Sequence, residues 1–247
     1  MNLRKTAVIY LRGIDLDDVL SFTRLRAILK KYVHRNNLLI VFDAEYQYQK
    51  NLKEKGIQEA QLSASDSHRL KAAITRDLGK TFAQKLSEEL IPALSLTAYH
   101  LGIVKTSSNG EVAAIQAELI RKRFFGNTLP IFAAIGDQDV LLNPKNLAKI
   151  FSIGLKADYL IFISDRKDWL NQVRELNGKF LDPNQKTLTE SESIVMKDNL
   201  SNEWFEDIES GFHALKNGVN RAFLTDLSNF EKLLQSQELV LMELIHN

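Results

Sequence analysis

The chain has 247 residues, 45% hydrophobic and 26% charged, a composition typical of a globular protein with a sizeable core. Its 32 lysines and arginines nearly balance its 31 aspartates and glutamates, so we expect no nucleic-acid partner. The absence of cysteine excludes disulfides, thiolate metal sites and cysteine nucleophiles. Neither a cleavable leader nor a run of about 18 apolar residues stands out, so we expect a cytoplasmic protein without membrane contact.

Strands and helices alternate through the first part of the chain. β-Branched and aromatic residues crowd residues 6–11 and 38–42, which predicts two short buried strands. Acidic residues at 15–18 favour a helix start after the first strand, and apolar residues then recur at helical spacing as far as Lys31. A second helix is predicted over residues 46–55, where a glycine ends it.

The middle of the chain continues the alternation. Asp66 is predicted to cap a long amphipathic helix over residues 67–90, which Pro92 closes. The elements that follow are two weak strands, a helix and a clear buried strand, at residues 96–104, 110–115, 117–125 and 129–136.

The last part of the chain begins with a predicted helix over residues 144–155 and a buried strand over residues 158–165. Residues 176–198 are polar and carry an Asp-Pro-Asn turn, which predicts a hairpin excursion. The remaining predicted elements are a helix and two strands, at residues 204–215, 221–226 and 239–245.

Strands that alternate with helices predict a three-layer α/β/α sandwich with a mainly parallel central sheet and ligands at the carboxyl ends of the strands. We expect a single domain over residues 1–247. The five histidines show no metal-ligand spacing, so no metal site is predicted.

Three stretches carry a family resemblance: residues 110–136, "GEVAAIQAELIRKRFFGNTLPIFAAIG", residues 143–165, "NPKNLAKIFSIGLKADYLIFISD", and residues 214–226, "ALKNGVNRAFLTD". The order and spacing of these stretches resemble those of the amino acid kinase family, and within it most of all acetylglutamate kinase and the kinase-like domain of acetylglutamate synthase. The resemblance implies a substrate and dimerisation lobe over residues 1–140, a nucleotide-binding lobe over residues 141–247, and a homodimer.

The phosphate-binding turns of the family are altered in this sequence. The family's first strand ends in Lys-x-Gly-Gly, and the matching residues here place Tyr10 at the lysine, Arg12 at the first glycine and Gly13 at the second. Its second strand runs into His-Gly-Gly-Gly, and the matching turn here carries Asp43 and Glu45 and no glycine.

Further positions that the resemblance marks are also changed. The family's substrate-binding arginine is matched by Ser63, although Asp66 is kept. Asn143 matches a substrate-contacting asparagine, but the acidic position after it holds Lys145. Asp207 stands where the family has a second catalytic lysine.

These changes oppose phosphoryl transfer. Main-chain N–H groups approach a phosphate closely only where no Cβ intervenes, and the transfer depends on positioning and on neutralised charge. Loss of one such donor typically costs about 10²- to 10³-fold in rate. ATP would remain a cofactor only if magnesium bound the carboxylates of Asp43, Glu45 and Asp165 and Arg12 took the place of a lysine.

Three further residues have two interpretations each. Arg12 would bind a ligand carboxylate through its planar guanidinium group, or form a salt bridge with Asp15 or Asp17. Asn143 would orient a ligand, or only start a helix before Pro144. The third, Asp165, ends a buried strand where the family binds nucleotide, or caps the next helix.

The leading hypothesis is a catalytically degenerate acetylglutamate kinase-like protein that binds a small ligand or a partner protein, in arginine or other amino acid metabolism. The ligand would be an amino acid and the partner an acetyltransferase or another biosynthetic enzyme, since the resemblance extends to acetylglutamate synthase. The pocket residues would be Arg12, Gly13, Asp43, Glu45, Ser63, Asp66, Asn143 and Asp165. The alternatives are an active ATP-dependent kinase of a small carboxylate and a purely structural dimer partner.

Overall fold

The computed structural model describes residues 4–107, 111–126, 128–164, 187–196, 202–235 and 242–245. Within these residues, eight strands form one sheet in the order β3-β6-β2-β1-β7-β9-β10-β8. Neighbouring strands are parallel except β9 and β10, which are antiparallel. The strands are β1 Thr6–Leu11, β2 Asn37–Phe42, β3 Ala93–Thr97, β6 Leu129–Ala133, β7 Tyr159–Ile163, β8 Thr187–Thr189, β9 Arg221–Thr225 and β10 Met242–Ile245.

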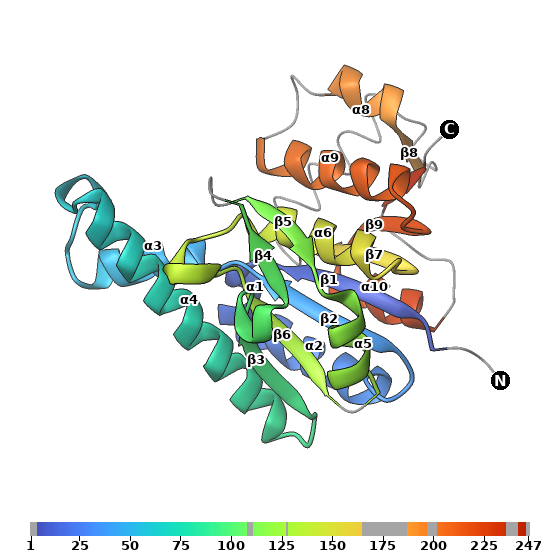
Figure 1. The fold of residues 1–247 in the computed structure, drawn as a ribbon, viewed down its shortest axis with the longest axis horizontal. Helices are drawn as coiled ribbons and strands as arrows, with labels where there is room; N and C mark the ends of the chain where they lie inside the picture. The colour runs from blue at the N-terminus through green and yellow to red at the C-terminus, as the bar shows by residue number, and fades with distance from the viewer. Residues whose placement is uncertain are drawn as a thin grey trace.

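Helices and a small hairpin surround this sheet (Figure 1). The hairpin pairs β4 Val104–Thr106 with β5 Val112–Ile115 in antiparallel orientation. The helices are α1 Gly13–Asp17, α2 Val19–Tyr32, α3 Glu45–Glu54, α4 Ala64–Ser87, α5 Ala117–Arg123, α6 Pro144–Gly154, α8 Glu190–Met196, α9 Asn202–Lys216 and α10 Leu227–Leu234. Short 3₁₀ turns are η1 Glu59–Gln61, η2 His100–Gly102 and η3 Asp137–Asp139.

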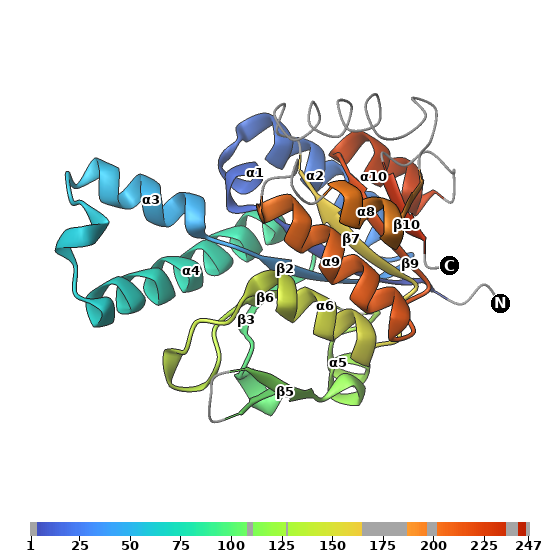
Figure 2. The same ribbon diagram turned by 90° about the horizontal axis from the view of Figure 1, so that it is seen from above.

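The sheet separates two hydrophobic cores. Along β1, Val8 and Tyr10 point into one core, which α5, α6 and α9 complete, while Ile9 and Leu11 point into the other, which α2, α4 and α10 complete. Alternate residues of a strand face opposite sides of a sheet, so a strand buried on both sides reads as a continuous apolar run. The predicted three-layer α/β/α sandwich with a mainly parallel sheet is confirmed, and Figure 2 shows helices on both sides of it.

Several elements differ from the sequence-based expectation. The weak strand expected over residues 96–104 is the end of β3, the turn η2 and the first residue of β4. The helix expected to start at residues 15–18 is two helices, because Asp18 is extended between α1 and α2 and its side chain accepts a hydrogen bond from the N–H of Ser21 at 2.7 Å. Ser63, rather than Asp66, caps α4. Helix α10 was not predicted, although Asp226 caps it through the N–H of Asn229 at 2.7 Å.

Helices α3 and α4 form a long pair that projects from the sheet, with their connection at the far end (Figure 2). The pair is joined by a hydrogen bond of 2.8 Å between the hydroxyl groups of Tyr48 and Ser67. Of the expected excursion at residues 176–198, the described residues form only β8 and α8, and the rest lies outside the described residues. No helix in the described parts of the chain is long and apolar enough to cross a membrane.

Candidate functional site

The carboxyl ends of β1 and β2 lie side by side. The strands are parallel neighbours in which Leu11 pairs with Phe42. The N–H of Asp43 continues this pairing by donating to the carbonyl oxygen of Leu11 at 3.2 Å. The turns that follow the two strands, residues 12–13 and 43–45, therefore meet at one edge of the sheet, where ligands bind in parallel α/β folds.

The carboxylate of Asp43 binds the donors of these two turns. One of its oxygens accepts hydrogen bonds from the N–H of Gly13 at 3.1 Å and the N–H of Glu45 at 3.3 Å. The other accepts a hydrogen bond from the hydroxyl of Tyr10 at 2.5 Å. A negatively charged group of the protein itself thus occupies the main-chain N–H groups that the family resemblance assigns to phosphate.

Two further features close the turn around Gly13. The side-chain amide of Gln47 donates to the carbonyl oxygen of Gly13 at 2.7 Å. A Cβ added at Gly13 would lie 2.9 Å from the carbonyl oxygen of Asp43, closer than carbon and oxygen tolerate. Protein atoms therefore pack against the one glycine that this turn retains.

Tyr10 acts as a neutral donor beneath the turn. Its side chain is almost fully buried. Burial raises the pKa of the Tyr10 phenol well above its ordinary value, and the negative charge of Asp43 raises it further. The residue at the family's lysine position therefore donates a hydrogen bond to a carboxylate of the protein and carries no positive charge.

A buried ionic cluster lies beside these turns. Asp207 of α9, fully buried, forms ion pairs with Arg12, at the end of β1, and with Lys145, on α6, where the nitrogen and oxygen are 3.0 Å apart. Lys145 also lies 3.2 Å from Glu206. Burial raises the pKa of Asp207, and the ion pairs with Arg12 and Lys145 oppose that rise.

Both cations of this cluster are paired with carboxylates of the protein. Arg12 and Lys145 are both buried, with 4% and 6% of their surfaces exposed. An ion pair in a buried environment is screened weakly by solvent. The positive charge that a phosphate would require at this edge is therefore already compensated by Asp207 and Glu206.

A cavity of about 230 Å³ opens between the second turn, α3, α4 and the segment before α6. Its lining includes Asp43 and Glu45, which the sequence analysis named, and Tyr48, Lys71 and Thr75, which it missed. No motif marks the last three, because the pairing of α3 with α4 brings them to the strand ends. The remaining lining residues are Phe42, Ala44, Ala134, Leu141, Leu142 and Pro144.

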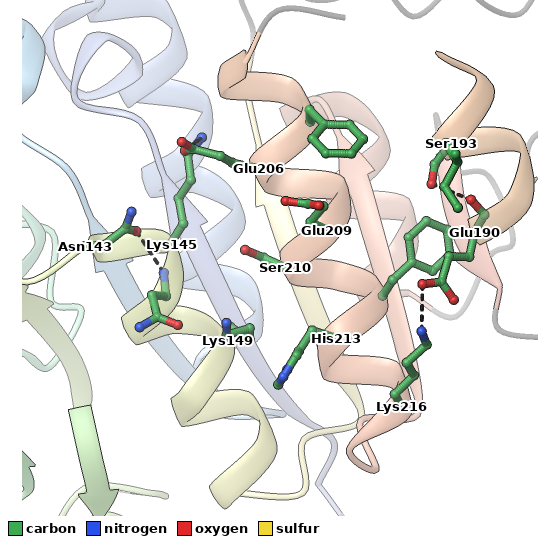
Figure 3. Close-up of a pocket in the computed structure, with 14 residues that line it drawn as sticks. Asn143, Lys145, Lys149, Glu190, Ser193, Glu206, Glu209, Ser210, His213 and Lys216 are labelled. Atoms are coloured by element: carbon green, nitrogen blue, oxygen red, sulfur yellow. Dashed lines mark hydrogen bonds and ion pairs between the residues drawn. The ribbon is translucent and has the colours of Figure 1, made fainter. Parts of the chain in front are cut away.

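A larger, more open groove of about 500 Å³ runs over α9 between α6 and α8 (Figure 3). Lys145 and Lys149 of α6 lie on one side of α9, and Glu190 of α8 lies on the other, 2.6 Å from Lys216. Partial burial and then the nearby Lys149 and Lys216 lower the pKa of His213, an exposed residue that lines this groove. The groove therefore carries charges of both signs, most of them in ion pairs.

The structure does not gather all the predicted site residues. Ser63 and Asp66 hydrogen-bond to each other at the start of α4, the far end of the α3–α4 pair (Figure 2). Asn143 caps α6, accepting from the N–H of Asn146 at 3.0 Å, and lines the groove. Asp165 lies outside the described residues.

The described residues do not fit a triphosphate with magnesium. The N–H of Gly13 is bound to Asp43, and the cations Arg12 and Lys145 are paired with Asp207. Among the described residues, no group of three histidine, aspartate or glutamate side chains is arranged to hold a metal ion. Asp43 and Glu45 belong to no such group within the described residues, and Asp165, the third carboxylate considered for magnesium, lies outside them.

Comparison with known proteins gives the fold. No family model and no curated protein matches the sequence. N-Acetylglutamate synthase from Neisseria gonorrhoeae, solved with coenzyme A and N-acetyl-glutamate, matches with a TM-score of 0.72 at 15% identity, over 98% of this chain and 60% of that one. Carbamate kinase from Giardia lamblia bound to AMP-PNP matches with a TM-score of 0.65 at 13% identity, over all of both chains.

Isopentenyl phosphate kinase matches with a TM-score of 0.64 at 15% identity, over 97% of this chain and 100% of that one. This chain thus spans 60% of the length of the synthase and the full length of the two kinases. The matches cover 97% or more of this chain, and the match to carbamate kinase covers all of it, including β1 and β2, whose ends carry the site. The chain therefore has the fold of the amino acid kinases.

Proposed function

We propose that this protein is a catalytically inactive relative of the amino acid kinases that binds a small ligand or a partner protein. Its role would lie in amino acid metabolism, such as the metabolism of arginine, in the cytoplasm. The single domain that we expect over residues 1–247 would present the strand ends as its binding surface. Asp43 and Glu45 would line that surface, beside Gly13 and the buried Arg12, and no phosphoryl group would be transferred.

The position of the Asp43 carboxylate is the main support for this proposal. A phosphoryl group needs the N–H of Gly13 and positive charge at the same edge, because the transfer relies on neutralised oxygen charge. Asp43 accepts that N–H at 3.1 Å and adds a negative charge. Two unit charges of like sign about 4 Å apart repel by roughly 4 kcal/mol at an effective dielectric near 20.

The exchange of charge between two family positions supports the same conclusion. The resemblance places an acidic residue at position 145 and a lysine at position 207, whereas this chain has Lys145 and Asp207. The charges at the two positions are thus exchanged, and in this chain the charged atoms lie 3.0 Å apart. The structural function of the pair would survive this exchange, while its ability to hold a phosphate would not.

The experiment compares ligands by their effect on thermal stability. We expect ATP with magnesium to leave the melting temperature unchanged and no ADP to form with N-acetylglutamate, carbamate or arginine as phosphate acceptor. A ligand present at about 100 times its dissociation constant adds about 2.7 kcal/mol to the free energy of unfolding. An active acetylglutamate kinase treated in the same way is the positive control.

Turnover of ATP by the purified chain would contradict the proposal and favour the alternative, a divergent kinase of a small carboxylate. A stabilising effect of arginine or N-acetylglutamate without ATP would identify an amino acid ligand. A chain that no small molecule stabilises would act through a protein partner. A separate acetyltransferase is the first partner to test by co-purification, because the match covers only 60% of the synthase chain.

A homodimer is the proposed assembly. Strand β3 forms one edge of the large sheet, and Leu94 on it and Leu90 just before it are 43% and 84% exposed. An unpaired edge with exposed apolar side chains favours association. Light scattering during size-exclusion chromatography should give about twice the mass of one chain, and Leu94→Glu should reduce it to one.

A further inference from the structure

The cavity beside the second turn has apolar walls and a small volume. Leu142 belongs to one hydrophobic core and Phe42 to the other, and Tyr48 lines the cavity from α3. Its volume of about 230 Å³ lies below the roughly 300–1,000 Å³ of sites for drug-sized ligands. The body of a ligand here would be a short apolar chain or ring, much smaller than a nucleotide.

The polar groups of the cavity are mainly negative. Asp43 and Glu45 line it, and one cation, Lys71, lines it from α4. A third carboxylate, Glu59, lies 3.2 Å from the ammonium of Lys71. Among the described residues, the two lining carboxylates and Glu59 against one ammonium give this region a net negative charge, which favours a positively charged ligand and opposes a carboxylate or phosphate.

The contacts of the Lys71 ammonium show which groups of the cavity stabilise a positive charge. It lies over the ring of Tyr48, 4.4 Å from the ring centre, and 3.4 Å from Glu45. An aromatic face and carboxylates are the groups that recognise ammonium ions. Burial lowers the pKa of Lys71, but the carboxylates of Glu45 and Glu59 outweigh burial and raise it, so this environment stabilises an ammonium.

We propose that this cavity binds a small primary amine with a short apolar body, whose ammonium contacts Asp43 and Glu45. The body lies among Phe42, Leu141 and Leu142. Carboxylate oxygens each accept more than one hydrogen bond, so Asp43 keeps its bonds to Gly13 and Tyr10 while it receives the ammonium. This inference rests on the proposed ligand-binding function and specifies the ligand's chemical class.

The test uses four molecules of similar shape and different charge. They are 3-methylbutylamine, the neutral alcohol 3-methylbutan-1-ol, the anion 4-methylpentanoate, and leucine, which carries both charges. Each is titrated into the full chain without nucleotide, and binding is followed by the amide signals of residues 42–45 and 71–75 in NMR spectra. We expect saturable binding of the amine, at least about fivefold tighter than that of the alcohol, a ratio that corresponds to about 1 kcal/mol.

Variants of the two mouth residues sharpen the test. Lys71→Met keeps the apolar stem and removes the competing cation, so the amine should bind about threefold more tightly, as for a partly exposed charge. Glu45→Gln should weaken the amine by about the same factor, because the Glu45 side chain is 58% exposed. The matched controls are Lys80→Met on α4 and Glu54→Gln on α3, exposed residues away from the cavity, and both should leave the affinity unchanged.

Equal affinity for the amine and the alcohol would overturn this inference, as would tighter binding of leucine or 4-methylpentanoate. The inference would also be overturned if both Lys71→Met and Lys71→Gln bound the amine more weakly than the unchanged protein. Removal of a positive charge should weaken the binding of an anionic ligand, not of a cationic one. The inactive-kinase proposal has a separate readout. ATP turnover would refute that proposal whatever the amine titration shows, and a silent amine titration without ATP turnover would refute this inference alone.

Discussion

The ammonium of Lys145 lies 3.0 Å from a carboxylate oxygen of Asp207, in a pair that joins α6 to α9 beneath the strand ends. Arg12 at the end of β1 pairs with the other oxygen of the same carboxylate. Three elements from distant parts of the sequence therefore meet at one buried negative charge. Because a buried charge must be compensated, this cluster fixes how the first strand and the two helices pack.

Asp207→Asn should strongly destabilise the protein. The substitution leaves the charges of Arg12 and Lys145 buried without their common partner, and loss of one member of a buried ion pair costs about 3–5 kcal/mol. Urea unfolding followed by circular dichroism would measure the change in the free energy of unfolding.

Glu206→Gln is the matched control for this prediction. Glu206 precedes Asp207 on α9 and also pairs with Lys145, at 3.2 Å, but its side chain is 56% exposed. An exposed pair contributes about 0–1 kcal/mol. Equal losses of stability in the two variants would show that burial does not set the strength of this cluster.

Asp43→Gly should create an anion site. The substitution removes the carboxylate from the N–H of Gly13 and the hydroxyl of Tyr10, and leaves these donors directed at the same place. The variant should lose stability but gain a response to phosphate or pyrophosphate. At ten times the dissociation constant, the anion would add about 1.4 kcal/mol to the free energy of unfolding.

Glu45→Gln separates the effect of released donors from that of charge. It removes one negative charge from the same turn while Asp43 still holds the N–H of Gly13. Phosphate should therefore stabilise the Asp43→Gly variant. It should not change the stability of the Glu45→Gln variant or of the unchanged protein. A response of Glu45→Gln equal to that of Asp43→Gly would mean that net charge, and not occupied donors, excludes anions.

Periodicity and composition predicted most of the sheet. The strands β1, β2, β6 and β7 are buried on both faces, so each reads as a run of β-branched and aromatic residues that is hard to assign to anything else. Helix α10 escaped prediction because its eight residues follow β9 after a single capping residue, Asp226. Short helices give too few turns for a periodic signal.

The site was harder to predict than the sheet. Family positions pointed to Tyr10, Arg12, Asp43, Lys145 and Asp207 as separate departures from a phosphate site. Their pairings were not visible in the sequence, because Arg12 and Asp207 are 195 residues apart and only the sheet order brings them together. A local pattern reports neighbours along the chain, whereas an ion pair between elements depends on topology.

The cavity beside Asp43 illustrates the same limit. Tyr48 and Lys71 lie on different helices and belong to no motif, yet the ring of one and the ammonium of the other are 4.4 Å apart. The contact follows from the packing of α3 against α4, two helices that run side by side in Figure 2. Sequence periodicity gives the two helices, but not the rotation of one against the other.

His213 should make the protein less stable in mild acid. Burial, and then the positive charges of Lys149 and Lys216, lower the pKa of His213 below its ordinary value of about 6.5. The folded state therefore prefers the neutral imidazole. Its contribution to stability is complete above the unfolded pKa and is lost as the pH falls through that value toward the lower folded pKa.

The measurement compares melting temperatures at pH 7.5 and pH 5.0, together with an NMR titration of the His213 ring. His213→Gln should show a smaller loss between the two pH values, because glutamine does not titrate. Lys149→Met should also reduce the loss, by removing a repelling charge, whereas Lys122→Met on α5 should not change it. A His213 pKa at or above the ordinary value would show that the charges around the groove attract a proton, contrary to the arrangement in Figure 3.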